Sequence, residues 1–178
     1  KGGAIYLAGE LGQGKTRLLA IAKFYAQRYG LSVIAANCRP QDRPFGAFTA
    51  VYTEFSDQEK ETILRATFEG DESNQVRERY PIIAAIREMI VEHAPCVISI
   101  DDMENADPAT IELLEYLIRN TLLLSKEPIV YVLAEETTSK QKTALARRLC
   151  EAGPVQWHHL GPLSEPEVEE LVLSILPN

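Results

Sequence analysis

The segment over residues 9–16 constrains the fold of this chain more than any other feature. It reads G-E-L-G-Q-G-K-T, a complete G-x-x-x-x-G-K-[ST] phosphate-binding loop. An apolar run over residues 4–8 precedes the loop, and a helical pattern over residues 15–29 follows it. Glycines let the backbone turn tightly and present its N–H groups to a polyphosphate, and the dipole of the following helix favours the same anion. The segment therefore predicts a strand, a loop and a helix that hold a nucleoside triphosphate.

The residue types in the loop predict a role for each conserved position of the motif. Lys15 places a flexible positive charge on the β- and γ-phosphates, so it is a candidate catalytic residue. The Thr16 hydroxyl is a predicted ligand of Mg²⁺. Glu10 is expected to be a solvated loop acid. The candidate nucleotide-binding residues are Gly9, Glu10, Leu11, Gly12, Gln13, Gly14, Lys15, Thr16 and Arg17.

The composition indicates one compact domain with a sizeable core. The chain has 178 residues, of which 46% are hydrophobic. A net charge of −8 argues against direct nucleic-acid binding by this segment, because nucleic acids are held mainly by positive charges on their phosphates. No stretch is long and apolar enough to span a membrane, and no signal peptide is visible. We expect a single domain over residues 1–178 that is a piece of a longer multidomain protein.

The cysteines favour a reducing compartment. Cys38, Cys96 and Cys150 lie far apart and form no C-x-x-C pair. Cysteines in this arrangement are typical of reduced, buried small hydrophobic residues. We therefore expect a cytoplasmic protein without disulfides.

Short apolar runs alternate with helical patterns along the chain, which predicts a parallel α/β sheet with helices on both faces. The expected strands cover residues 4–8, 31–36, 96–100, 129–134 and 155–160. The expected helices cover residues 15–29, 57–68, 81–92 (or a helix that begins near Gln75), 107–124 and 139–150, followed by a last helix with a capping box of Ser164 and Glu167. Irregular loops are expected at 38–48 and 71–74.

The third strand ends in two carboxylates, Asp101 and Asp102. In proteins with a phosphate-binding loop, an acid at the tip of such a strand holds Mg²⁺, and we assign this role to Asp101. Asp102 is a candidate general base that polarises the attacking water. The alternative is a pair of solvated turn acids. Glu104 and Asn105, which follow, either orient water or cap the local turn.

Four segments together resemble a known family. The run D-D-M-E-N-A-D-P-A-T-I-E-L-L-E-Y-L over residues 101–117 is similar to a signature of the signal-transduction ATPases with numerous domains (STAND), which are related to AAA+ ATPases. The phosphate-binding loop, the segment R-P-Q-D-R-P-F-G-A-F over residues 39–48 and the segment L-G-P-L-S-E-P-E-V-E-E-L-V over residues 160–172 also match. The resemblance covers nearly the whole chain.

The resemblance implies a three-layer P-loop NTPase fold with a five-stranded parallel sheet in the order 5-1-4-3-2. It also implies a Mg²⁺-dependent ATPase that acts as a conformational switch between ATP and ADP states. Its partners would be flanking sensor or effector domains and, in some members, further copies in a nucleotide-dependent homo-oligomer. Pro162 lies where the C-terminal motif of the family approaches the nucleotide.

The chain departs from the family pattern after the fourth strand. Members often carry a polar or arginine sensor there, whereas this chain has Glu135 and Glu136. Because a carboxylate repels a γ-phosphate, we expect both to point to solvent and any sensing to fall to Thr137 or Thr138. Arg147 and Arg148 are either an arginine finger or a basic last turn that complements the helix dipole.

Three functions remain open from the sequence. The first is an ATP-binding regulatory switch with slow ATP hydrolysis. The second is a nucleotide-binding scaffold that does not hydrolyse ATP. The third is an assembly ATPase similar to the Orc/Cdc6 group of AAA+ proteins.

Overall fold

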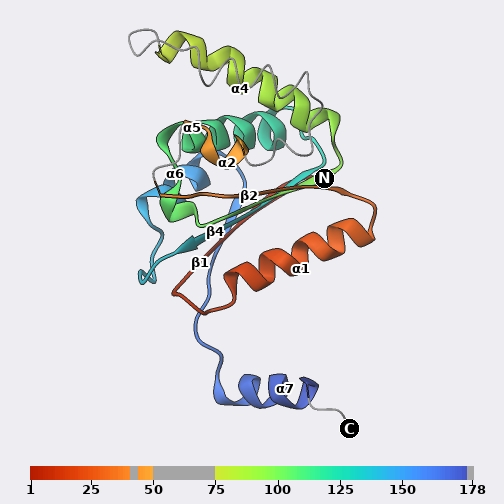
Figure 1. Cartoon of the computed structure of the whole chain (residues 1–178), viewed down its shortest axis with the longest axis vertical. Helices are drawn as coiled ribbons and strands as arrows, with labels where there is room; N and C mark the ends of the chain where they lie inside the picture. The colour runs from red at the N-terminus through yellow and green to blue at the C-terminus, as the bar shows by residue number, and fades with distance from the viewer. Residues whose placement is uncertain (41–43, 50–74, 176–178) are drawn as a thin grey trace.

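The computed structural model describes residues 1–40, 44–49 and 75–175 (Figure 1). The expected helix over 57–68 and the expected loop over 71–74 lie outside the described residues. The strands are β1 (Gly3–Gly9), β2 (Ser32–Asn37), β3 (Cys96–Asp101), β4 (Ile129–Glu136) and β5 (Val155–His159). The helices are α1 (Lys15–Arg28), α2 (Gly46–Thr49), α4 (Gln75–Glu92), α5 (Pro108–Leu117), α6 (Ala144–Ala152) and α7 (Glu165–Ile175), with the short turns η2 (Met103–Asn105) and η3 (Ile118–Leu124).

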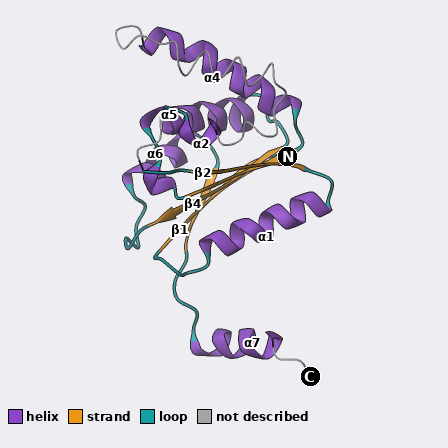
Figure 2. Ribbon diagram, in the orientation of Figure 1, coloured by secondary structure: helices purple, strands orange, loops and turns teal. Residues whose placement is uncertain are grey.

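The five strands form one parallel sheet in the order β2-β3-β4-β1-β5, which confirms the predicted order. Helix α1 covers one face, while α2, α5 and α6 cover the other, with α4 outside α5 (Figure 2). Every residue of β3 is buried, as expected for a strand covered on both faces. The chain therefore has the three-layer architecture of a P-loop NTPase.

The hydrophobic core has two parts, one on each face of the sheet. The larger part contains Tyr6 and Tyr131, both fully buried, and packs under α5 and α6. The smaller part, around Leu19, lies between the sheet and α1. Two cysteines, Cys38 and Cys96, are buried and the third is half-buried, and none of the three forms a disulfide. Cys38 and Cys96 are buried as expected, whereas Cys150 is not fully buried.

Helix α5 begins as the sequence predicts. The Asp107 carboxylate accepts hydrogen bonds from the N–H groups of Ala109 and Thr110, both at 3.0 Å, and Pro108 occupies the first helical position. The same carboxylate also accepts from the N–H groups of Phe45 (3.1 Å) and Gly46 (3.3 Å). Asp107 therefore joins the loop after β2 to the segment that follows β3.

Helix α4 begins at Gln75, the earlier of the two expected starts. Two other helix boundaries differ from the sequence expectation. The α-helical part of α5 ends at Leu117, and η3 continues it as a π-helix because the Ser125 N–H donates to the carbonyl of Asn120 five residues before. Helix α6 begins at Ala144 instead of near residue 139, because the Thr143 hydroxyl caps it by accepting from the Ala146 N–H.

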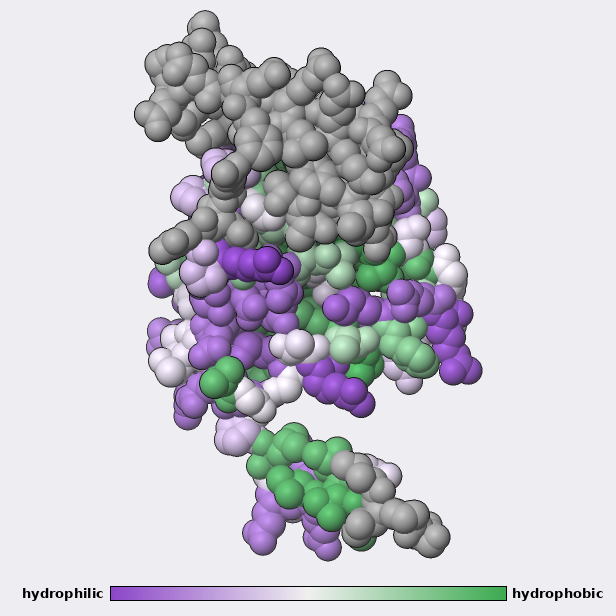
Figure 3. Space-filling model, viewed as in Figure 1, coloured by the Kyte–Doolittle hydropathy of each residue, from purple (hydrophilic) through white to green (hydrophobic). Residues whose placement is uncertain are grey.

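Helix α7 stands apart from the layered body (Figure 1). Glu167 forms the expected contact of the capping box, accepting from the Ser164 N–H at 2.7 Å. The side chains of residues 165–174 are all exposed, including those of Val168, Leu171 and Val172. Hydrophobic surface of α7 lies on the side of the helix that faces the rest of the molecule (Figure 3), and Val168 and Leu171 line a cleft shared with the phosphate-binding loop.

Candidate nucleotide-binding site

The phosphate-binding loop lies at the carboxyl end of β1, where parallel α/β sheets bind ligands. Gly12 and Gly14 have φ angles of 82° and 86°, in the left-handed region that favours glycine. The loop is closed by a hydrogen bond from the Glu10 N–H to Gln13 Oε1 at 2.8 Å. Gly14 precedes α1 and has no side chain to cap the helix. The first N–H groups of α1 are therefore available to bind an anion at the loop.

The first glycine of the loop is required for a different reason, namely lack of space. A Cβ atom at Gly9 lies 2.9 Å from the carbonyl oxygen of Leu160 and 2.6 Å from Gln13 Oε1. We expect Gly9→Ala to lower the free energy of unfolding by about 1–3 kcal/mol, because the backbone of the loop or of the β5 end must shift. Gly3→Ala is the matched control on the same strand, since a Cβ there meets nothing within 4 Å. Chemical denaturation of both variants measures the difference, and equal stabilities contradict the prediction.

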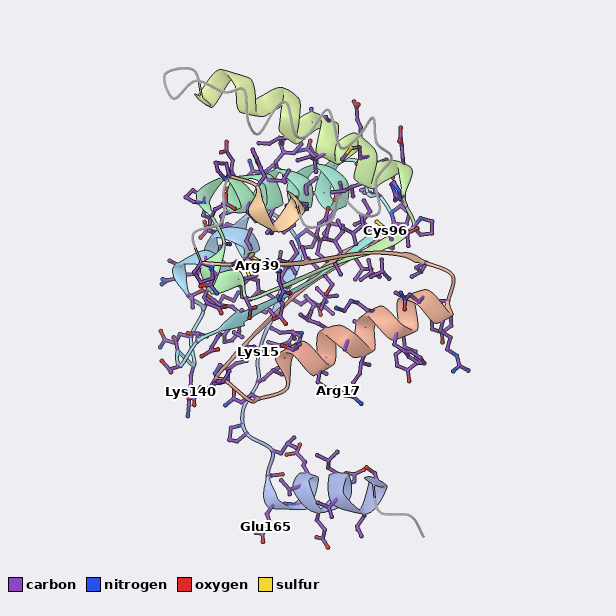
Figure 4. All side chains as sticks on the ribbon, viewed as in Figure 1. Lys15, Arg17, Arg39, Cys96, Lys140 and Glu165 are labelled. Atoms are coloured by element: carbon purple, nitrogen blue, oxygen red, sulfur yellow. The ribbon has the colours of Figure 1, made fainter. Side chains whose placement is uncertain are left out.

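Lys15 is held inside the loop. Its side chain is buried, and Nζ donates hydrogen bonds of 2.8 Å to the carbonyl oxygens of Gly9 and Glu10. The ammonium group is therefore fixed at the centre of the loop rather than extended into solvent (Figure 4). A bound polyphosphate offers the same cation a charged acceptor, which is stronger than a carbonyl.

Thr16 and Asp101 meet although 84 residues separate them in the sequence. The Thr16 hydroxyl donates to Asp101 Oδ2 at 2.7 Å, and Asp101 is buried. A hydroxyl beside a carboxylate fits Mg²⁺, which binds one or two protein oxygens and completes its shell with phosphate oxygens and water. Among the described residues no group of three or more His, Cys, Asp and Glu side chains is arranged to hold a metal ion.

Asp102 occupies an unusual backbone conformation directly after β3. Its φ angle is 56°, in the left-handed region. Burial raises the pKa of its carboxyl group, and the neighbouring carboxylates of Asp101, Glu104 and Glu136 raise it further, while Lys15 lowers it. The Asp102 Oδ2 atom accepts a hydrogen bond from Asn37 Nδ2 at 3.3 Å. Asp102 is therefore placed among site residues rather than on a free turn.

Sequence reasoning missed Asn37. It is the last residue of β2 and pairs in register with Asp101 on β3, so the ends of the two strands lie side by side. A polar residue at the end of a predicted strand was the available signal, because the carboxyl ends of parallel strands meet at one edge of the sheet.

The expectation that Glu135 points to solvent is wrong. Its side chain is 4% exposed, and its Oε2 accepts a hydrogen bond from the Thr143 hydroxyl at 2.9 Å. A strand places alternate residues on one face, so Glu135 shares a face with the fully buried Tyr131 and Leu133. Burial is the main cause of the raised pKa of the Glu135 carboxyl. Glu136, by contrast, is exposed, as expected.

Glu135 makes stability depend on pH. Because its folded-state pKa is raised, its contribution to stability is full below the unfolded-state pKa and is lost as pH rises through the folded-state pKa. As pH rises from 4 to 8, we expect the stability of Glu135→Gln to increase relative to that of wild type. The increase is about 1.4 kcal/mol for each unit by which folding raises the pKa of Glu135. Unfolding free energies across this range measure the difference. Glu151→Gln, at an exposed position, is the control, and a difference independent of pH contradicts the prediction.

The candidate sensor threonines and the residues after Asp102 lie near the loop. The Thr137 N–H donates to the carbonyl of Gly9 at 3.0 Å, so the end of β4 contacts the start of the loop. Thr138 is exposed. Glu104 does not cap its own turn, because its Oε2 accepts from the Glu136 N–H at 2.8 Å. Asn105 Nδ2 lies 3.4 Å from Glu104 Oε1.

A cleft of about 1190 Å³ adjoins the loop. The remaining candidate residues, exposed Leu11 and Arg17, line it, and so does Pro162, as the family resemblance implies. Lys140 reaches it from the loop after β4, and Figure 4 shows Lys140 and Arg17 on the same side of the molecule as Lys15. Leu171 of α7 lines the opposite wall. The cleft therefore has room for the part of a nucleotide beyond the phosphates.

Arg147 and Arg148 do not form a basic last turn, because α6 continues to Ala152 and its last turn has no basic residue. Arg148 pairs with Glu115 of α5 through two hydrogen bonds, of which that from Nη2 to Oε2 is 2.7 Å. Arg147 Nε lies 3.5 Å from the carbonyl oxygen of Thr143.

The fold and the site together define a P-loop NTPase of the AAA+ kind. The features that define this class are the strand order, the phosphate-binding loop after β1 and the acids at the end of β3. The model of the AAA ATPase domain family matches residues 1–132, so the chain belongs to this family. Comparison with curated protein sequences finds no match.

Solved structures of AAA+ proteins share the fold. AMPPCP-bound DnaA from Aquifex aeolicus is 20% identical with a TM-score of 0.52, and the match covers 97% of this chain and 45% of that one. The Orc1 protein of Aeropyrum pernix, solved in complex with DNA, is 20% identical with a TM-score of 0.54 over 97% of this chain and 43% of that one. A RuvB mutant from Thermotoga maritima is 17% identical with a TM-score of 0.53 over 97% and 43%. The chain spans less than half the length of these proteins.

Proposed function

We propose that this chain is an ATP-binding, Mg²⁺-dependent ATPase domain that acts as a regulatory switch of the STAND type within a larger cytoplasmic protein. The observation that carries the proposal is the contact between Thr16 of the phosphate-binding loop and Asp101 at the tip of β3. It brings the two halves of the predicted site together. The family match to AAA ATPase domains supports the same activity. None of the helices in the described ranges is long and apolar enough to cross a membrane.

The proposed mechanism assigns one task to each residue. The backbone of residues 9–17 holds the phosphates, and Lys15 neutralises the β- and γ-phosphates. Thr16 and Asp101 hold Mg²⁺, which when bound offsets negative charge on the phosphates. Asp102 accepts a proton from the attacking water, a task that its raised pKa favours because the pKa is brought toward neutral pH.

The proposed switch is supported by contacts in the site that a nucleotide would compete with. Lys15 Nζ is bonded to the carbonyls of Gly9 and Glu10, and Asp102 accepts from Asn37. A γ-phosphate that binds Lys15, and a water that hydrogen-bonds to Asp102, compete with these contacts. They therefore favour a state in which the contacts are absent. ATP and ADP then stabilise different states to different extents, which is the requirement for a population shift. Flanking sensor or effector domains are the proposed readers of this shift.

A second candidate is an assembly ATPase, favoured by the similarity in fold to the DNA-replication proteins DnaA and Orc1. In this case ATP would drive a homo-oligomer, with Arg147 or Arg148 as the arginine finger of a neighbouring copy. Size-exclusion chromatography of the protein with ATP and with ADP tests the assembly candidate. An ATP-dependent ring supports assembly, and a monomer in both states contradicts it. The net charge of −8 argues against direct contact between this segment and DNA.

The first experiment measures nucleotide content and turnover in one preparation. Nucleotide that co-purifies is released and identified, and phosphate release is then followed with ATP and Mg²⁺. Bound ADP with slow turnover supports the switch. Bound nucleotide with turnover at background supports a scaffold that does not hydrolyse ATP.

A further inference from the structure

The end of β4 has a backbone donor that no strand pairs. Pairing between β3 and β4 stops at Ile100 and Leu133, while β4 continues beside β1 as far as Glu136. Parallel strands direct successive N–H groups toward alternate neighbours. Because the Thr137 N–H donates to β1, the Glu136 N–H points to the side that β3 has left. This N–H needs a partner from elsewhere in the chain.

Glu104 is that partner. Its Oε2 accepts from the Glu136 N–H at 2.8 Å, so a side chain continues the hydrogen bonding where the β3–β4 ladder ends. Glu104 belongs to η2, which is anchored by the fully buried Met103. In the same turn the Asn105 N–H donates to the Asp102 carbonyl at 2.9 Å. Glu104 and Asp102 therefore belong to one hydrogen-bonded turn, so the position of one affects the position of the other.

We propose that Glu104 is a positioning residue for ATP turnover, because its hydrogen bond to the Glu136 N–H holds the turn that carries Asp102 against the end of β4. The inference rests on the proposed function. Asp102 sits in a left-handed conformation that costs energy for a residue other than glycine, so the turn depends on contacts outside itself. Glu104 acts through the placement of Asp102 and of Thr137, which follows Glu136 and contacts the loop.

The variants Glu104→Ala, Glu104→Gln and Glu136→Gln test this role. We expect Glu104→Ala to lower kcat about fivefold to tenfold with little change in KM, the effect of losing one hydrogen bond that acts in the transition state. Glu104→Gln keeps a side-chain oxygen that accepts from the amide, so it retains most of the activity. Glu136→Gln removes a carboxylate near Asp102 but keeps the backbone N–H, so its kcat stays within about twofold of wild type.

The three variants distinguish the effect of the Glu104 hydrogen bond on kcat from the effect of negative charge near Asp102. If the negative charge near Asp102 is what matters, Glu104→Gln and Glu136→Gln change kcat as much as Glu104→Ala, and the proposal is overturned. Amide hydrogen exchange at Glu136, measured by NMR without nucleotide, is a readout independent of hydrolysis. We expect faster exchange in Glu104→Ala, with protection largely restored in Glu104→Gln. Unchanged exchange in Glu104→Ala also overturns the proposal.

The experiment distinguishes failure of this inference from failure of the proposed function. Wild-type protein that binds ATP but releases no phosphate contradicts ATP turnover and with it any role of Glu104 in turnover. Wild-type protein that hydrolyses ATP while Glu104→Ala does so at the same rate contradicts only the role of Glu104.

Discussion

Replacing Lys15 with alanine is expected to weaken ATP binding about 100-fold or more, the effect of losing two charge-assisted contacts to phosphate oxygens. Lys15 is the buried cation of the loop, and its Nζ lies within 2.8 Å of two loop carbonyls. In the variant these carbonyls lose their donor and the phosphates lose their closest positive charge. Isothermal titration calorimetry with ATP and Mg²⁺ measures the change.

The matched control for Lys15 is Lys23→Ala on the same helix, two turns from the loop. It removes the same charge from the chain, so it reports any effect of net charge alone. We expect its ATP affinity to stay within about twofold of wild type. Normal ATP binding by Lys15→Ala would show that the nucleotide lies elsewhere and that the site assignment is wrong.

Replacing Asp102 with asparagine is expected to slow phosphate release about 100-fold or more, which is the contribution typical of a general base. Asparagine has nearly the same shape and can still accept the hydrogen bond from Asn37, but it cannot accept a proton from water. ATP affinity should change little, because the phosphate contacts remain. Single-turnover phosphate release and ATP titration on the same preparation measure the two effects.

Two results would contradict the role of Asp102. The first is phosphate release at the wild-type rate, which would make Asp102 an ordinary turn acid. The second is loss of ATP binding, which would make Asp102 a binding residue rather than a base. Glu136→Gln is the control for removal of a nearby carboxylate, because the side chain of Glu136 is exposed at the end of β4.

Much of the fold could be predicted from the sequence because local patterns decided it. Glycines at the turns of the loop, apolar runs of strand length and the cap formed by Asp107 and Pro108 each depend on a few adjacent residues. The start of α6 could not be predicted in this way. Several residues near 139 favour a helix start, and the cap at Thr143 is selected by its contact with Glu135 on β4.

The wrong expectation for Glu135 shows what local sequence patterns cannot predict. A carboxylate at the end of a strand usually faces water, since burying a charge is costly unless the group is paired or protonated. Here the strand period places it on the same face as Tyr131, and Thr143 supplies a donor. The donor comes from a segment whose position depends on the packing of α6, which no local pattern contains.

Local sequence patterns were enough to predict the phosphate-binding loop, the pair of acids at the end of the third strand and the parallel α/β class, because each depends on residues that are neighbours along the chain. Which of these residues meet depends on the packing of the whole chain. The contact between Thr16 and Asp101, the hydrogen bond from Asn37 to Asp102 and the one from the Glu136 N–H to Glu104 all join segments that are distant in the sequence. Their geometry follows from sheet order and from the point where each strand ends, and these are properties of the packed chain as a whole.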